Sequence, residues 1–492
     1  MEKDQIIYQS TRSGHLTATA SEAILQGIAP DGGLYVPDHF PEYTDSFEHL
    51  ANQSYQQVAL KIMSMLLTDF TEEELKHCIS CAYDSKFDIP QITRLKEAGG
   101  AWYLELFHGA TIAFKDMALS ILPHLMTTAA KKNGVTDEIV ILTATSGDTG
   151  KAAMAGFADV PGTRIIVFYP KGGVSTIQEK QMVTQPGENV HVVGIRGNFD
   201  DAQTAVKKIF ADKAIQERME KSGKRFSSAN SINIGRLVPQ IVYYFYAYGQ
   251  LVKEGKIPAG FRINICVPTG NFGNLLAAFY AKMMGLPVEN LICASNENRV
   301  LTDFFHTGEY NRNREFKLTS SPSMDILVSS NLERLLYMLC GDVKTKDFMA
   351  QLSAEGRYDV GAEVHEKIAG QFFAACCDDD ATRARIRQVW RDSAYLIDTH
   401  TAVAADAIAQ YRAQTGDETP AVVVSTASPF KFAADVCAAL GAASGNDPLA
   451  DLSAYCGIPT PAPLSGLDSR PVRFDGVTEK ADMRATVDRF LR

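Results

Sequence analysis

Short apolar runs that alternate with amphipathic stretches dominate the chain from about residue 101 onward. Two runs, at 138–145 and 163–170, are rich in β-branched residues and are bounded by turn residues. Three further runs of the same texture lie at 261–268, 290–296 and 420–428. Continuous apolar runs of this length are typical of parallel strands that are buried on both faces. The pattern therefore predicts an α/β fold with parallel sheets.

The first hundred residues follow a different pattern, which predicts a separate N-terminal unit. Thr and Ser residues in 16–30 precede an apolar helical pattern, and a turn with Gly and Pro follows at 31–40. Amphipathic helices are predicted at 54–70 and 71–84, and the second of these has Glu residues in its first turn.

The remaining organisation follows from where composition changes along the chain. Residues 300–395 are more helical and more charged than their surroundings, which indicates an elaboration of the α/β region. The end of the chain is rich in Pro and Gly before a helix predicted at 479–491. We therefore expect an N-terminal domain at 1–100, a catalytic α/β region at 101–443 and a C-terminal segment at 444–492.

Composition narrows the classes of protein that this pattern allows. The chain has 492 residues, of which 46% are hydrophobic and 22% are charged, so collagen, disordered acidic chains and disulfide-rich miniproteins are excluded. Its 48 basic and 58 acidic side chains give a net charge of −10, which disfavours nucleic acid and anionic lipid as partners. No 18-residue apolar run occurs, and acidic residues stand near the start where a signal peptide needs basic ones. We expect a cytoplasmic protein that binds no membrane.

The nine cysteines are an odd number scattered through the chain, which is typical of reduced thiols. The single C-x-x-C pair, Cys78 and Cys81, lies in a predicted helix without a second pair at zinc-ribbon spacing. We interpret this pair as helix packing in preference to a metal or redox site, and we predict no metal.

Polar loops follow three of the predicted strands and precede a helix each time. Such corners leave the backbone N–H groups of a helix N-terminus unpaired, and they lie at the carboxyl ends of parallel strands, where ligands bind. Neither a P-loop nor a complete G-x-G-x-x-G motif follows any of these strands, which disfavours nucleotide binding. The three loops consist of Ser146, Gly147, Asp148, Thr149 and Gly150; Gly270, Asn271, Phe272, Gly273 and Asn274; and Ser425, Thr426, Ala427 and Ser428.

Lys115 is the candidate nucleophile of the sequence. Ala113, Phe114 and Met117 surround it, and a lysine in apolar surroundings has a lowered pKa that favours Schiff-base chemistry. The alternative interpretation is a surface lysine paired with the adjacent Asp116.

Together these windows resemble the threonine synthase family of pyridoxal-phosphate enzymes of fold type II. The resemblance runs from about residue 5 to residue 440, and it fades in 305–390 and in the Pro-rich tail. It includes the opening segment at 8–37, which resembles the family's own N-terminal domain and which other fold type II enzymes lack. The motifs that carry it are FHGATIAFKDMAL, TATSGDTGKAA, YPKGGVSTIQEKQM, SANSINIGRLVPQ, VPTGNFGN and STASPFKF.

The resemblance implies a fold of two parallel-sheet α/β lobes around pyridoxal 5′-phosphate. Lys115 would hold the cofactor as an internal aldimine, the Gly270–Asn274 loop would hold its phosphate, and Thr426 would meet its pyridine nitrogen. The loop from Ser146 to Gly150 would hold the amino-acid end of the substrate. The expected ligands of the substrate phosphate are Asn230, Ser231, Asn233 and Arg236, with Lys171 as a weaker candidate.

The reaction implied by the family is the conversion of O-phospho-L-homoserine and water to L-threonine and phosphate, by a monomer or homodimer. A dehydratase or β-replacement enzyme of the same fold, and a phospho-lyase that releases a keto acid, are the alternative enzymes. A catalytically silent binding protein is the alternative from another class.

One arginine and two histidines near these motifs have two possible interpretations each. Arg236 is either a phosphate ligand or a helix-surface arginine in an ion pair. His108 is either structural or an acid–base group. His400, which precedes a helix of small residues, is read as helix-start packing near the active-site cleft in preference to a catalytic role.

Overall fold

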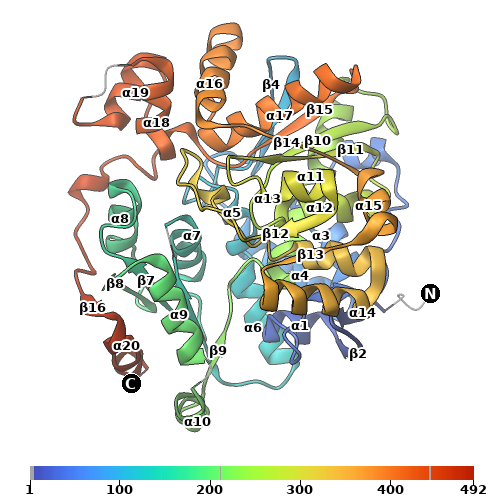
Figure 1. The fold of residues 1–492 in the computed structure, drawn as a ribbon. Coiled ribbons are helices and arrows are strands. Elements are labelled where there is room, and N and C mark those ends of the chain that lie inside the picture. Colours follow the sequence, from blue (N-terminus) through green and yellow to red (C-terminus); the bar gives the residue numbers. More distant parts are fainter. Residues whose placement is uncertain (1–4, 146, 211, 443–444, 492) are drawn as a thin grey trace.

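A computed structural model describes residues 5–145, 147–210, 212–442 and 445–491 (Figure 1). Two sheets of parallel strands form the cores of a smaller and a larger lobe, as the apolar runs predict. The smaller lobe has the strand order β16-β8-β7-β6-β9, and every pairing is parallel. Its strands are β6 (Glu138–Ala144), β7 (Thr163–Pro170), β8 (Val190–Arg196), β9 (Lys224–Ser227) and β16 (Val477–Glu479).

Alternate side chains of the smaller sheet pack into two different apolar clusters, as strand geometry requires. Ile139 and Ile141 face the main core of the molecule, whereas Val140 and Leu142 face a separate cluster on the other side. Helices α7 (Asp148–Phe157) and α8 (Thr176–Val183) belong to the first side. The second side is covered by α9 (Phe199–Phe210), α10 (Lys213–Lys221) and α20 (Met483–Phe490).

The larger lobe is built on a six-stranded sheet with the order β14-β11-β10-β15-β5-β4, in which only the β4–β5 pairing is antiparallel. Its faces are covered by α11 (Ile234–Lys253) and α12 (Gly273–Met283) on one side, and by α16 (Asp379–Ser393), α17 (Thr399–Thr415) and α18 (Ala433–Leu440) on the other. Its strands are β4 (Arg94–Ala98), β5 (Ala101–Glu105), β10 (Ile263–Pro268), β11 (Val288–Ser295), β14 (Phe372–Cys376) and β15 (Ala421–Ser425).

The N-terminal segment adds a small antiparallel sheet and four helices. The sheet has the order β2-β1-β3, and its strands are β1 (Tyr8–Ser10), β2 (Ser13–Ala18) and β3 (Tyr35–Pro37). Helix α4 begins as the Thr71 capping box and the Glu-rich first turn predict. The helices are α1 (Ala20–Gln26), α2 (Phe47–Ala51), α3 (Tyr55–Leu66) and α4 (Glu72–Ala82).

Residues 300–395 are helical, as expected, and also contain short strands that the pattern does not predict. Glycine 341 has φ 78°, which interrupts α14 with a kink. The additional elements are α13 (Val300–Thr307), β12 (Glu309–Asn311), the 3-10 helix η1 (Pro322–Met324), α14 (Leu332–Glu355), β13 (Arg357–Asp359) and α15 (Gly361–Ala369).

The end of the chain passes from one lobe to the other. After the 3-10 helix η2 (Pro429–Phe432) and α18, helix α19 (Pro448–Cys456) packs on the larger lobe. The red trace in Figure 1 then runs down the side of the smaller lobe through η3 (Leu467–Ser469) and η4 (Lys480–Asp482) to α20. The predicted last helix is therefore shorter than 479–491, because its first residues form β16 and η4.

Helices α5 (Lys115–Leu119) and α6 (Leu122–Lys132) connect β5 with the smaller lobe. In Figure 1, α5 lies between the two lobes. No helix in the described part of the chain is long and apolar enough to cross a membrane.

Candidate active site at Lys115

Lys115 lies at the start of α5, and its amine meets groups from both lobes. Its Nζ lies 3.7 Å from Oδ2 of Asp148, which begins α7 of the smaller lobe. The same Nζ lies 3.4 Å from Oγ of Ser323, which belongs to η1. The side chain of Lys115 is 12% exposed, and its burial lowers the pKa of the amine despite the nearby Asp148 carboxylate. These are the surroundings of a reactive lysine.

The alternative pairing of Lys115 with Asp116 does not occur. Asp116 is buried and accepts hydrogen bonds from the backbone N–H and the hydroxyl of Thr111, at 2.8 and 2.6 Å. Burial raises the pKa of Asp116, and the two Thr111 bonds oppose that shift. Asp116 therefore holds the loop before Lys115, and the surface-lysine interpretation is wrong.

Asp148 is held on both of its carboxylate oxygens. Oδ2 accepts from Ser323 Oγ at 3.0 Å, and Oδ1 accepts from Gln178 Nε2 at 2.9 Å and faces Lys431 Nζ at 3.2 Å. Burial alone would raise its pKa, but Lys431, Lys115 and the Gln178 bond outweigh burial and hold the pKa of Asp148 well below its usual range. Asp148 is thus an ionised carboxylate beside the Lys115 amine.

Hydrogen bonds from backbone N–H groups and one positive φ angle determine the shape of the rest of the first polar loop. Thr145 Oγ1 accepts from the N–H groups of Gly147 and Gly150 at 3.0 and 2.9 Å. Gly147 has φ 138°, a conformation that side chains other than glycine's rarely adopt. Thr149 is half-buried one residue into the helix. Ser146 lies outside the described residues, so its predicted role stays a prediction.

Two side chains of the Gly270–Asn274 loop turn into the core. Phe272 is buried and has φ 63°, and it precedes α12. Asn274 Oδ1 accepts the hydroxyls of Tyr243 and Tyr244, both at 2.5 Å. In the described part of the chain no side chain caps the N-terminus of α12. Its free N–H groups and the positive end of the helix dipole suit a phosphate.

The segment after η1 covers this loop. Ser329 Oγ donates to the carbonyl of Gly270 at 2.7 Å, and Asn331 donates to the carbonyl of Asn271 at 3.1 Å. A Cβ at Gly270 would lie 3.0 Å from the Ser323 carbonyl oxygen, so this position favours glycine.

Thr426 lies directly after β15, close to the Lys115 loop. Its carbonyl accepts from the Phe114 N–H at 2.8 Å, and Ala113 pairs with Ala427 in an isolated antiparallel bridge. The third polar corner and the lysine are therefore joined by backbone hydrogen bonds.

Arg236 lies in the first turn of α11 and is buried rather than on the helix surface. Its Nη1 donates to the carbonyl of Ala229 at 3.1 Å, and its Nε is buried without a partner among the described residues. Burial lowers the pKa of Arg236 to about 10. The surface ion-pair interpretation is wrong, and the unpaired N–H suits an anionic ligand.

The other residues of the SANSINIGR segment are arranged differently. Asn233 caps α11, accepting from Gly235 N–H at 2.9 Å and donating to the carbonyls of Ile24 and Ser228 at 3.0 Å each. Asn230 is exposed and Ser231 is half-buried. Their predicted contacts with substrate phosphate stay predictions.

Three further residues lie in ion pairs and caps. Lys171 pairs with Glu179 at the surface. His108 lies between Asp88 and Glu105, at 2.6 and 2.9 Å. His400 bonds Asp398, the cap of α17, at 2.8 Å and accepts the N–H of Ser323 at 3.1 Å. His400 thus supports the Ser323 segment from the start of α17.

Sequence reasoning missed two residues of the site. Ser323 comes from the region in which the resemblance fades, where the polar run Thr319–Ser323 between helical stretches was the available signal. Lys431 was part of the STASPFKF motif, but nothing in the sequence indicated that it reaches Asp148. Among the described residues, no group of three or more His, Cys, Asp or Glu side chains could hold a metal ion.

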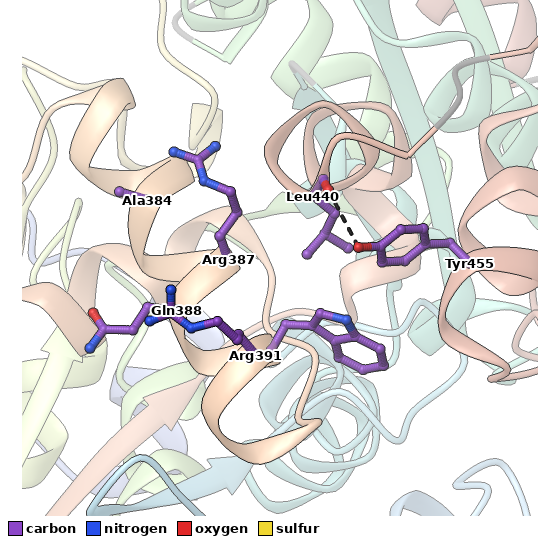
Figure 2. A pocket seen from close by; sticks show the side chains of 7 residues that line it. Ala384, Arg387, Gln388, Arg391, Leu440 and Tyr455 are labelled. Atoms are coloured by element: carbon purple, nitrogen blue, oxygen red, sulfur yellow. Dashed lines mark hydrogen bonds between the residues drawn. The ribbon is translucent and has the colours of Figure 1, made fainter.

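A surface pocket of about 670 Å³ lies elsewhere, between α16 and the α18–α19 pair. Figure 2 shows Arg387 and Arg391 of α16 lining it opposite Tyr455 and Leu440. Arg387 donates to the carbonyl of Ala439, and Arg391 pairs with Asp392. This pocket contains none of the residues around Lys115.

Two lobes with a buried lysine between them and an uncapped helix N-terminus are the features of a pyridoxal-phosphate-dependent enzyme. The profile described as "Pyridoxal-phosphate dependent enzyme" matches residues 89–427. Two more profiles, "Threonine synthase N terminus" and "Threonine synthase, C-terminal", match residues 7–83 and 401–488. The chain belongs to the threonine synthase family.

Relatives over most of the chain carry the same family name. The chain is 36% identical over 461 residues to "Threonine synthase" of Schizosaccharomyces pombe, covering 87% of this chain and 88% of the relative. It is 40% identical over 436 residues to "Threonine synthase-like 1" of Macaca fascicularis. That match covers 85% of this chain but only 58% of the longer relative.

Solved structures agree with the fold. The PLP-bound threonine synthase from Brucella melitensis has a TM-score of 0.88 and 34% identity, covering 99% of this chain and 100% of that one. Threonine synthase from Escherichia coli has a TM-score of 0.76 and 27% identity, covering 98% and 99%. The predicted fold of two parallel-sheet lobes with an N-terminal domain is confirmed, and so is the cofactor, pyridoxal phosphate.

Proposed function

We propose that the protein is a threonine synthase, which converts O-phospho-L-homoserine and water to L-threonine and phosphate, the last step of threonine biosynthesis. The observation that carries the proposal is the buried Lys115 amine, which lies between an ionised Asp148 and the Ser323 hydroxyl at the junction of the lobes. The name "Threonine synthase" of the Schizosaccharomyces pombe relative, which is 36% identical, supports the same reaction.

The residues present fit pyridoxal phosphate. The uncapped N-terminus of α12 would hold its phosphate through backbone N–H groups from Gly270 to Asn274, and Lys115 would bind its aldehyde carbon. Thr426 would meet the pyridine nitrogen with a hydroxyl, which leaves that nitrogen largely unprotonated. When bound, the cofactor supplies an electron sink that stabilises negative charge on the substrate carbons.

Lys115 would act as the proton-transferring base. Its lowered pKa favours the neutral amine, which removes the Cα proton of the substrate and then a proton from Cβ. One amine can serve both carbons because they are adjacent. Phosphate leaves from Cγ, and the two protons that the amine holds in turn return to Cγ and to Cα. Water adds its hydroxyl at Cβ, and its remaining proton goes to the departing phosphate.

The two ends of the substrate would meet different elements. The N-terminus of α7, which begins at Asp148, suits the amino-acid carboxylate through the positive end of its dipole. Arg236 suits the phosphate, because its buried guanidinium retains an unpaired N–H that a phosphate oxygen satisfies. Asn230 and Ser231 lie on the same segment and would complete the phosphate site.

A product assay tests the proposal directly. Purified protein supplied with O-phosphohomoserine should release phosphate and threonine in equal amounts, measured by molybdate colorimetry and by chromatography of the amino acids. Alpha-ketobutyrate in place of threonine would show a phospho-lyase instead. Release of neither product would reject both reactions.

The assignment of Lys115 has its own test. Borohydride treatment of the yellow wild-type protein should attach the cofactor covalently to the peptide that contains Lys115, as mass spectrometry can show. Lys115→Ala should lose both this attachment and at least about 10³-fold in rate, because no other amine replaces the base. Lys431→Gln serves as the control for loss of a buried lysine and should still be labelled at Lys115.

A further inference from the structure

Lys431 is a buried lysine whose amine contacts the site only through Asp148. It lies in η2, which follows the third polar corner and begins at the Ser428 cap. Its side chain is 0% exposed, and its Nζ donates to the Thr111 carbonyl at 2.9 Å and faces Asp148 Oδ1 at 3.2 Å. A substrate therefore has no direct access to this amine.

Asp148 carries the effect of Lys431 to Lys115. Its Oδ1 faces Lys431 and Gln178, which leaves Oδ2 directed at Ser323 and at the Lys115 Nζ, 3.7 Å away. Four contacts on two oxygens determine the orientation of the carboxylate. Removing one partner of a buried ion pair leaves the other charge uncompensated, which favours its reorientation or protonation.

We propose that Lys431 is a positioning residue, which holds the Asp148 carboxylate against the nitrogen of Lys115 and thereby favours the protonated form of that nitrogen. The proposal rests on the proposed function, because it takes Lys115 as the cofactor lysine. It assigns a role to Lys431, the lysine of the STASPFKF segment, although Lys431 does not touch the reacting atoms.

The direction in which the pKa of the Lys115 nitrogen shifts when Lys431 is lost distinguishes this positioning role from a direct charge effect of Lys431. Lys431 acting directly repels a proton on Lys115, so its loss would raise the pKa of the Lys115 nitrogen. Lys431 acting through Asp148 has the opposite sign, because its loss weakens the carboxylate that stabilises the proton. Other charged or titratable groups that act on this pair are Asp116, Arg236 and His400.

The experiment is a pH titration of the cofactor's visible absorption in the reconstituted holoenzyme. It compares wild type, Asp148→Asn, Lys431→Met and the double variant. We expect Asp148→Asn and Lys431→Met each to lower the titration midpoint by about 1 pH unit or more, the size typical of losing an opposite charge at this range. In the Asp148→Asn background, Lys431→Met should add no more than about 0.3 unit.

Lys151→Met is the matched control. Lys151 is also a buried lysine, but its amine bonds Gln185 rather than Asp148. Its loss should leave the midpoint within about 0.3 unit of wild type. Where Lys431→Met does not fold, Lys431→Gln keeps a donor for the Thr111 carbonyl and should give the same downward shift.

Two results would overturn the inference. These are a raised midpoint in Lys431→Met, or an equal shift in the wild-type and Asp148→Asn backgrounds. Both leave the proposed function intact if the wild type carries the cofactor and forms threonine. A wild-type protein that binds no cofactor at Lys115 overturns the proposed function instead.

Discussion

Arg236 is a buried residue whose arrangement suits a bound anion but lowers the stability of the ligand-free fold. Its guanidinium is buried and makes one described bond to a carbonyl, so its charge is poorly compensated within the protein. An uncompensated buried charge destabilises a folded chain. A bound phosphate would provide the missing acceptor and charge, which is the physical reason to retain such a residue.

Arg236→Met should therefore lower activity and raise the stability of the ligand-free protein. We expect a loss of about 10- to 150-fold in kcat/KM for O-phosphohomoserine, the value of a charged hydrogen bond. The free energy of unfolding in urea should rise at the same time. Arg391→Met, at an arginine with a 77% exposed side chain, is the control and should change neither quantity measurably. Equal activity of Arg236→Met and wild type would contradict the phosphate role.

Among the elements, the strand–loop–helix corners are where the site is built. Helices α1, α3, α4 and α8 begin with capping boxes that satisfy their first N–H groups. Helix α12 begins after the left-handed Phe272 without such a cap among the described residues, so its N–H groups stay available. Other helices, α7 among them, also begin without a side-chain cap from a described residue, so an open helix start permits anion binding but does not by itself identify a site.

Gly147→Ala tests the corner before α7. The substitution places a Cβ 2.5 Å from the Gln178 carboxamide at a residue with φ 138°, so Gln178 must leave Asp148 and the backbone is strained. The strain should lower the free energy of unfolding by about 1–3 kcal/mol, measured in urea. Activity should fall with it. Gly476→Ala has no atom within 4 Å of the new Cβ, and it should behave like wild type in both measurements.

At the scale of the whole molecule, the last helix, α20, packs on the smaller sheet. Helix α20 places the buried Met483 and Val487 against the outer face of the smaller sheet, in one cluster with Ile166 and Phe168. Residues more than 300 positions apart in the sequence thus meet in a single apolar layer. The last part of the C-terminal segment, β16 and α20, is therefore part of the smaller lobe.

Met483→Ala should therefore destabilise the protein by about 2–5 kcal/mol, because it leaves a cavity in that layer. Urea unfolding followed by circular dichroism measures the change. Met283→Ala removes a methionine that is 48% exposed, and it should cost less than about 0.5 kcal/mol. If the two substitutions have equal effects, α20 does not contribute to the core of the lobe.

The packing of α20 on the smaller lobe also predicts that the stability of the protein depends on pH. His191 of β8 stacks on Phe490 of α20, with ring centroids 4.4 Å apart. Burial, assisted by Arg164, lowers the pKa of His191 to about 4. Because the unfolded chain binds this proton near pH 6.5 and the folded chain does not, stability should fall as the pH drops from 7 toward 4. His191→Gln should reduce that fall, whereas the exposed His49→Gln should leave it unchanged in urea titrations.

Much of the site could be predicted, because short local sequence patterns indicate the strands and the polar corners that build it. The apolar runs before Gly147, Gly270 and Thr426 indicated strands, and the polar residues after them indicated corners. Ser323 and Lys431 escaped prediction, because the polar run around Ser323 and the motif around Lys431 do not indicate which distant residues they meet. Burial also changed the reading of Arg236, since helical periodicity alone does not say which neighbours cover a face.

The sequence by itself determined the α/β class and the places of the corners, because strand periodicity and turn chemistry depend on neighbours in the chain. The candidate lysine followed from the resemblance of FHGATIAFKDMAL to a family motif. Only the tertiary structure decided what surrounds that lysine. Ser323 lies 208 residues from Lys115, and Lys431 lies 320 residues from Thr111. Such contacts depend on how two sheets bring their strand ends together, and that packing is a property of the folded chain.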